Sequence, residues 1–240
     1  MSARQTSLAE AAAVAVGGGV VAGATGSLVG LTVPAAAIGA VNGALAGWRR
    51  IYDWSSARGH VAFVLDSSWA LATTASGIFA NVVGLASRTS GYVPELSTRQ
   101  NRHVYRAGFR PRKGYAITLG NVVSGGGDVD VPRRARLVTD HEDVHVWQAR
   151  WFGPLYPLLY GAWLIVGGAV GAVAWATSRR RRGDRFAATV ESAAYYLNPF
   201  EWWAYSRDAA WPPSGVVQGF GWRRPVVKPL AQVRHPRTAR

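Results

Sequence analysis

Two histidines four residues apart, with a glutamate directly after the first, carry the clearest chemical pattern in the chain. They are His141, Glu142 and His145 in the stretch DHEDVH. On a helix, residues four apart share one face, so both imidazoles can reach a single metal ion. Glu142 is badly placed to bind that ion but can act as general base toward a metal-bound water. The spacing therefore predicts a zinc site, with Gln148 on the same helix face.

A zinc site of this kind needs a third ligand, and the chain contains no cysteine. Two glutamates downstream are candidates: Glu191, in ESAAY, and Glu201, in NPFEWWAY. We favour Glu201, because the preceding Asn-Pro starts a helix cleanly, while Glu191 remains the alternative. Tyr205 falls on the same helix face as Glu201, at i+4. It could donate a hydrogen bond to a reaction oxyanion, or it could simply pack in a tryptophan-rich helix.

The two stretches together resemble a known pattern. HEDVHVWQARWFGPLY followed by NPFEWWAY resembles the HExxH…NPxExxA pattern of gluzincin-type zinc metallopeptidases, and it is especially similar to small bacterial membrane-associated members. The resemblance covers about half of the chain, roughly residues 100–208. It implies that His141, His145 and Glu201 bind Zn²⁺ and that Glu142 is the catalytic base.

The resemblance also implies a substrate cleft and shows one departure. The stretch GYAITLGNVV is similar to the edge strand that lines the cleft in such enzymes and can pair with extended substrate. Many gluzincins carry an Asp four residues after the ligand Glu, where it orients a histidine. That position is Tyr205 here, so Asp208 or Asp140 would have to take this role.

These residues must be positioned by a small α+β domain, which we place at residues 99–210 and expect to be zincin-like. RHVYRAGF and GYAITLGNVV, separated by RPRK, predict a β-hairpin, and ARLVT a short third strand. A helix is expected to start near Asp140, with Thr139 or Asp140 as its N-cap. A second helix is expected at 184–197 and the Glu201 helix after Asn198. Residues 211–240 are basic and are expected to be disordered.

The N-terminal region predicts membrane anchorage. Residues 11–48 carry no charge over 38 positions, and Gly39, Gly43 and Gly47 recur every four residues. Small residues at that spacing let two helices approach closely, so residues 1–50 are interpreted as a glycine-zipper transmembrane hairpin that could also mediate homo-oligomers. One long helix or a flexible linker is the alternative. Residues 51–98 are interpreted as an apolar interfacial helix and linker.

A second uncharged block, residues 151–178, separates the histidines from Glu201. A single crossing would put these ligands on opposite sides of a membrane, and arginines flank the block at both ends. Because basic residues favour the cytoplasmic side, residues 153–178 are expected to form a re-entrant hairpin with two arms of about ten residues, too short to span. The rival interpretation is a true span with a site inside the membrane.

Charge and composition narrow the choice of partner. There are 27 Lys+Arg against 13 Asp+Glu, a net charge of +14, together with 11 Trp. This balance suits an anionic surface, but the long apolar blocks favour the inner leaflet of a bacterial cell membrane over nucleic acid. We expect a membrane-anchored zinc metallopeptidase facing the cytoplasm, acting on a peptide or membrane-protein substrate. A non-proteolytic zinc-binding scaffold and a basic membrane adaptor with a chance HExxH are the alternatives.

Overall fold

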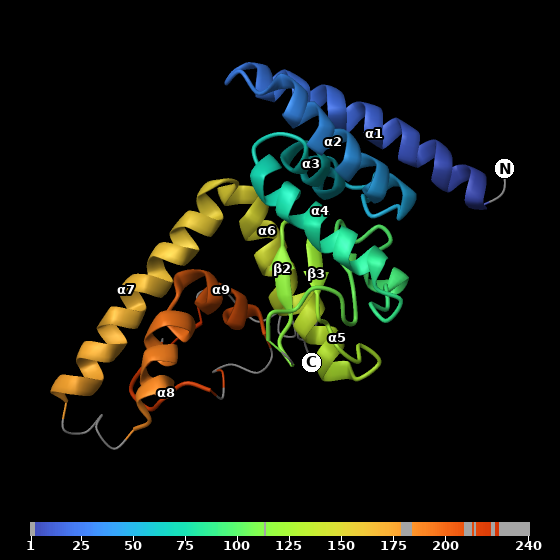
Figure 1. Cartoon of the computed structure of the whole chain (residues 1–240). Coiled ribbons are helices and arrows are strands. Elements are labelled where there is room, and N and C mark those ends of the chain that lie inside the picture. Colours follow the sequence, from blue (N-terminus) through green and yellow to red (C-terminus); the bar gives the residue numbers. More distant parts are fainter. Residues whose placement is uncertain are drawn as a thin grey trace, which may run out of the picture. The chain divides into compact units, whose positions relative to one another are not determined.

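The computed structural model describes residues 3–112, 114–178, 184–208, 213, 215–221 and 224–225. The chain divides into two compact units, Met1–Tyr156 and Pro157–Arg240, and each is described here by itself. Most of the predicted basic tail at 211–240 lies outside the described residues. The fold class is α+β, with many helices and one small sheet (Figure 1).

The first unit begins with helices, continues through the sheet and ends with the helix that carries the histidines. The elements are α1 Ala3–Ser27, α2 Thr32–Trp48, α3 Ala57–Asp66, α4 Leu71–Ala86, η1 Pro94–Leu96, β1 His103–Val104, β2 Ile117–Leu119, β3 Val122–Ser124, α5 Pro132–Arg136, η2 Leu137–Glu142 and α6 Asp143–Phe152.

Helices α1 and α2 form a tightly packed antiparallel pair (Figure 1). A Cβ atom on Gly39 or Gly43 would collide with the α1 backbone at Gly18 or Val14, and one on Gly47 with the backbone at Glu10. Glycine at these positions therefore lets the two backbones touch, as the four-residue spacing predicts. The predicted helical hairpin is confirmed.

Helices α3 and α4 meet at 91° and replace the single apolar helix expected in this region. Ser56 caps α3, because its side chain accepts a hydrogen bond from the Gly59 N–H. The bend at residues 67–70 is closed by a hydrogen bond from Ala70 N–H to the Leu65 carbonyl. The buried face of α4 is rich in small and polar residues, which lets it pack closely on β2 and β3.

The sheet has the strand order β1-β3-β2. β1 pairs parallel with β3, and β2 pairs antiparallel with β3 through Leu119↔Val122 and Ile117↔Ser124. The hairpin therefore lies within GYAITLGNVV, and the hairpin predicted between that stretch and RHVYRAGF is wrong. The reason is the two-residue turn at Gly120 and Asn121, where Gly120 has φ 55°, a conformation that favours glycine in such turns.

The helix carrying HEDVH begins earlier than expected. Pro132 opens α5, which continues through the π-helical segment η2 into α6. Proline is well tolerated in the first turn of a helix, so the chain is already helical at ARLVT. The predicted third strand there and the predicted start near Asp140 are both wrong, and Glu142 and His145 lie within a longer helical run.

A buried polar network ties α6 to the rest of the first unit. Arg150 donates from Nε and Nη2 to the two carboxylate oxygens of Asp66, both at 2.8 Å, and these side chains are 1% and 2% exposed. Tyr52 donates to Asp66 at 2.9 Å, and Asn121 donates to Asn42 at 2.9 Å and lies 3.3 Å from Asp66. The network thus links α2, α3, the β2–β3 turn and α6.

The second unit contains the apolar helix α7 Leu155–Thr177, which begins two residues before the boundary, then α8 Phe186–Glu191, η4 Ser192–Tyr196 and α9 Pro199–Arg207. α7 is one continuous helix of 23 residues, so the predicted bend within residues 153–178 is wrong. Pro157 falls in its first turn, where proline does not break a helix. Gly167 and Gly171 serve packing instead of bending: a Cβ there would collide with the backbone at Ala193 and Val190.

The chain turns back after α7, and the helices that follow, α8, η4 and α9, pack along α7. Residues 190–194 pack on Gly167 and Gly171 of α7, and Phe200 stacks on Tyr160 near the start of α7 with ring centroids 6.2 Å apart. Asn198 caps α9 by accepting from the Phe200 N–H, and Pro199 occupies its first turn, both as predicted. The Glu201 helix therefore begins beside the N-terminal end of α7.

Two helices among the described residues are long and apolar enough to cross a membrane: residues Gln5–Ser27 of α1 and all of α7. The bent pair α3–α4 would add a third if it counts as one broken span. These helices indicate membrane association.

Candidate metal centre

The two motif histidines point toward one another from one helical run. Their Nε2 atoms are 3.2 Å apart and both side chains are buried, His141 at 2% and His145 at 5% exposure. His141 lies in the π-helical segment η2, and His145 lies in α6. π-Helical turns inside helices are frequent at functional sites. The sequence prediction that both imidazoles share one helix face is confirmed.

The orientation of the His145 ring is fixed by side chains of the same unit. Its Nδ1 lies 2.8 Å from Gln148 Oε1 and 3.1 Å from the Tyr156 hydroxyl. An amide oxygen only accepts hydrogen bonds, so Nδ1 carries the proton and Nε2 presents its lone pair. This is the tautomer that a metal-binding histidine needs, with the partner of the other ring nitrogen setting it.

Glu142 is held by the sheet. Thr118 Oγ1, on β2, donates to Glu142 Oε2 at 2.7 Å, and the Glu142 side chain is buried at 5% exposure. β2 pairs with β3 alone among the described strands, so it forms one edge of the sheet. The carboxylate thus lies next to an edge strand. Sequence reasoning missed Thr118, because a lone threonine in a strand carries no motif.

The next residue, Asp143, anchors the helix on its other side. It accepts hydrogen bonds from Arg102 at 2.5 Å and from Arg58 at 2.8 Å. Burial lowers the pKa of Arg102, although the neighbouring Asp143 carboxylate opposes that effect. Successive acidic residues of the motif therefore do different work: Glu142 contacts β2, and Asp143 forms an ion pair.

Glu201 lies on α9 in the second unit and is buried at 3% exposure. The Tyr160 hydroxyl, on α7, donates to its Oε1 at 2.6 Å. This bond fixes the carboxylate relative to the start of α7. Tyr160 follows Tyr156 by one helical turn in the stretch GPLYPLLY, so this i, i+4 tyrosine pair after the motif is a sequence signal for the contact with Glu201.

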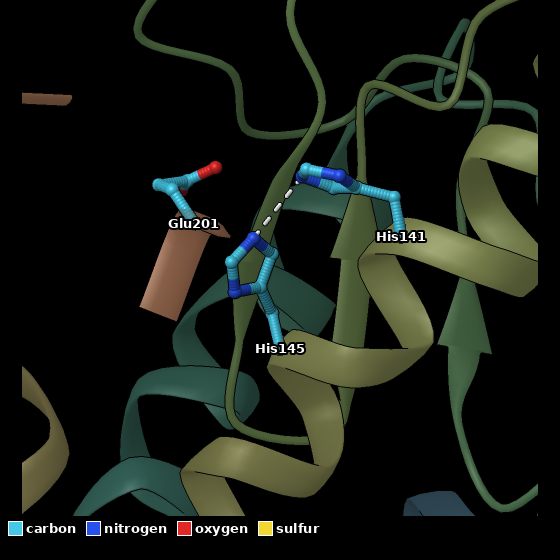
Figure 2. A group of neighbouring side chains, drawn as sticks. All are labelled: His141, His145 and Glu201. Atoms are coloured by element: carbon cyan, nitrogen blue, oxygen red, sulfur yellow. Dashed lines mark hydrogen bonds between the residues drawn. The ribbon is translucent and has the colours of Figure 1, made fainter. Parts of the chain in front are cut away.

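The side chains of His141, His145 and Glu201 form a buried group that could hold a metal ion. One ligand atom from each lies within 4.8 Å of the others. Figure 2 shows the two imidazoles approaching through their Nε2 atoms, with the Glu201 carboxylate beside them. Glu191 does not belong to this group, so of the two glutamates considered as third ligand the structure favours Glu201.

The other predicted residues are placed as follows. Tyr205 lies one turn after Glu201 on α9, and its ring packs against Tyr196 at 5.8 Å and Tyr195 at 6.4 Å between centroids. Asp208, the C-cap of α9, is fully buried. Asp140 is buried and accepts from the Thr139 hydroxyl at 2.8 Å. The catalytic role of Tyr205 and the orienting role of either aspartate remain predictions.

Comparisons with known proteins add no family assignment: no protein-family model, no curated protein and no solved structure matches the chain.

Proposed function

We propose that the protein is a membrane-associated zinc metallopeptidase, in which His141, His145 and Glu201 hold the zinc ion and Glu142 is the general base. The single observation that carries the proposal is the approach of the two Nε2 atoms to 3.2 Å, next to a carboxylate held on an edge strand. The resemblance of HEDVH…NPFE to the gluzincin pattern points to the same reaction.

The donor atoms fit zinc. Two nitrogens bound to tetrahedral zinc at 2.0–2.1 Å are separated by about 3.3 Å, close to the 3.2 Å seen between the Nε2 atoms. Two histidines and one glutamate are a common protein ligand set for catalytic zinc, which keeps one position open. Zinc bound there would act as a Lewis acid that makes water acidic enough to attack a peptide carbonyl near neutral pH.

Glu142 and β2 would supply the remaining chemistry. The Glu142 carboxylate would take a proton from the attacking water and pass it to the leaving amine. The hydrogen bond from Thr118 fixes its carboxylate at the edge of the sheet. An extended substrate pairing with β2 would then run past Glu142. Tyr205 would donate a hydrogen bond to the oxyanion of the attacked carbonyl.

For the cellular setting we propose a bacterial cell membrane, with the site facing the cytoplasm and the basic chain lying against anionic lipid. The net charge of +14 and the arginines that precede α7 support this orientation, because basic residues next to membrane helices are retained on the cytoplasmic side. The substrate would be a peptide or a membrane protein.

A non-proteolytic zinc-binding scaffold is the second candidate. It is favoured by one observation: Tyr205, which stands where many gluzincins carry an aspartate, packs on Tyr195 and Tyr196. In a scaffold the metal would serve structure, and the membrane hairpin could mediate association with further copies.

Metal analysis of the purified protein tests the metal site first. The wild type should bind one zinc per chain, and His145→Ala and Glu201→Ala should each lose it, whereas Glu191→Ala should retain it. A wild type without bound zinc would contradict both the peptidase and the scaffold. Retention of zinc by Glu201→Ala together with its loss by Glu191→Ala would reassign the third ligand.

Glu142→Gln then separates the two candidates. The amide keeps the shape of the side chain but cannot accept the proton, so hydrolysis of a generic unfolded protein substrate should fall by roughly 10²–10⁴-fold while zinc content is unchanged. A wild type that binds zinc and cleaves no member of a broad peptide library, in lipid or in detergent, would favour the scaffold.

A further inference from the structure

The turn that joins α1 to α2 is apolar and fully exposed. Residues 27–34 read SLVGLTVP, carry no charge and are exposed at every position. Leu28 is 83%, Val29 72% and Val33 78% exposed. A turn in water usually carries polar residues, and an exposed apolar surface of this kind marks contact with a partner or a membrane.

The backbone N–H groups of this turn are paired with carbonyls at the end of α1. The N–H groups of residues 28–31 donate to the carbonyls of Thr25, Gly26, Ser27 and Gly26 in turn. Gly30 has φ 73°, and the bond from Leu31 back to Gly26 is the six-residue closure of a Schellman motif. Pairing of this kind is what a segment in hydrocarbon requires.

Side chains and a proline reduce the remaining polarity. The Ser27 hydroxyl donates to the Ala24 carbonyl at 2.8 Å, and the Thr25 hydroxyl donates to the Val21 carbonyl at 2.9 Å. Pro34 lies in the first turn of α2, where N–H groups lack partners within the helix. Because proline has no N–H, it removes one donor that lipid could not satisfy.

The base of the hairpin has the opposite character. The Glu10 carboxylate accepts from Arg99 Nη2 at 2.7 Å, from Trp54 Nε1 at 2.9 Å and from Arg50 Nε at 3.3 Å. Charged and indole groups of this kind belong at the polar boundary of a membrane. The hairpin is therefore polarised along its length, from a charged base to an uncharged tip.

α1 as a whole is long and apolar enough to cross a bilayer, but Glu10 is held at the charged base of the hairpin, which shortens the uncharged arms beyond it. Residues 11–27 and 32–48 form arms of 17 residues each, about 25 Å, against about 30 Å of hydrocarbon. Moreover, Phe63 of α3 and its C-cap residue Ser67 pack against α1 at Gly17 and Gly18. Beyond that contact only residues 19–27 of α1 remain before the turn, about 14 Å.

We propose that the α1–α2 hairpin enters the bilayer from one face and that its tip, residues 27–34, ends in the lipid hydrocarbon without emerging at the far face. The occupant of the apolar tip surface is lipid acyl chain. A hairpin that crossed the bilayer would expose this uncharged tip to water. This anchor does not depend on the proposed zinc chemistry, because the residues that form it are separate from the metal ligands.

Site-directed spin labelling tests the proposal, and the absence of cysteine from the chain allows single thiols without background. Val29→Cys places a label at the tip. The matched control Thr98→Cys places one at an exposed residue beside Arg99, which binds Glu10 at the base. The full-length protein is reconstituted into vesicles of phosphatidylethanolamine and phosphatidylglycerol. Collision of each label with oxygen, which concentrates in lipid, and with a water-soluble nickel chelate present on both faces is then measured.

The tip label should collide mainly with oxygen and the base label mainly with nickel, so that their oxygen-to-nickel ratios differ several-fold. A tip label that collides mainly with nickel would overturn the proposal, because the tip would then lie in water. A tip label shielded from both reagents would also overturn it, since another protein surface, such as a second copy, would then cover the tip. Retained helical circular dichroism in both labelled proteins shows that the fold survives.

Discussion

Helix α6 presents two kinds of buried polar chemistry, and comparing them shows what distinguishes a structural cluster from a site. Arg150 follows His145 by five residues, which places it about 140° further around the helix. On this side of the helix the Arg150 guanidinium donates two hydrogen bonds to the Asp66 carboxylate and one to the Asn101 carbonyl. On the histidine side, two ring nitrogens face each other at 3.2 Å.

The partners explain the difference. On the Arg150 side, the Asp66 carboxylate accepts hydrogen bonds from the Arg150 guanidinium and from the Tyr52 hydroxyl, so the buried cation and the buried anion neutralise each other. Burial raises the pKa of Tyr52, and the Asp66 charge raises it further, so Tyr52 stays a neutral donor to Asp66. On the other side, Gln148 directs the His145 lone pair toward His141. Two ring nitrogens this close together can serve as ligands of one cation.

The largest effect is expected in stability, when the buried ion pair between Arg150 and Asp66 is broken. Arg150→Met removes one partner of a fully buried ion pair and leaves the Asp66 carboxylate uncompensated, which should cost about 3–5 kcal/mol of unfolding free energy. Chemical denaturation in detergent, followed by circular dichroism, measures this cost. The double variant Arg150→Met with Asp66→Leu should recover much of the stability. If the double variant is no more stable than the single one, the pair is not what holds α6 in place.

On the histidine side the next effect is expected in metal affinity. Gln148→Ala removes the acceptor that fixes the His145 tautomer and should weaken zinc binding about 10–100-fold. Competition with a zinc-binding dye measures this change. Gln148→Glu retains an acceptor at the same position and should bind zinc at least as tightly as the wild type. Equal affinity in the wild type and in Gln148→Ala would show that Gln148 does not set the tautomer.

A smaller effect should appear in turnover alone, provided that the protein is a peptidase. Thr118→Val keeps the side-chain shape but removes the hydroxyl that donates to Glu142. Loss of a hydrogen bond to a charged group of about 1.5 kcal/mol corresponds to roughly tenfold slower hydrolysis, with zinc content unchanged. Thr118→Ser should retain most of the activity. A Val variant as fast as the wild type would mean that Glu142 is positioned without this bond.

The smallest effect, taken over a single pH unit, is a pH dependence that separates a third buried imidazole from the two motif histidines. Burial, together with the positive charges of Arg49 and Arg150, lowers the pKa of His103 to about 3. The unfolded chain, with an ordinary histidine pKa near 6.5, then binds more protons than the folded one below that pH. Stability is therefore complete above about pH 6.5 and is lost progressively toward pH 3, by about 1 kcal/mol between pH 6.5 and 5.5.

The measurement compares unfolding free energies of the zinc-free wild type and His103→Gln across that pH range. Removing His103 should flatten the acid loss while leaving metal binding intact, since His103 is not one of the three residues that could hold a metal ion. An acid loss of the same size in the variant would assign the titration to other groups.

Local chemistry was predictable from local sequence. HEDVH fixed which side chains share a helix face, Asn198-Pro199 marked the start of the Glu201 helix, and the four-residue glycine spacing indicated the α1–α2 pair. These features depend on helix periodicity and capping, which act over a few residues. The helical run that carries the motif begins earlier than predicted, because Pro132 already opens a helix there.

Tertiary structure alone decided what lies beside these side chains. Nothing in the sequence paired Thr118 with Glu142, Asp66 with Arg150 or Tyr160 with Glu201, because such contacts join residues far apart in the chain. The path of the apolar block was decided in the same way. Its glycines suggested a bend. In the structure α7 is one continuous helix, its glycines contact residues 190–194, and the following helices bring the chain back along it. A glycine is compatible with either use, and only the surface packed against it determines which one the fold adopts.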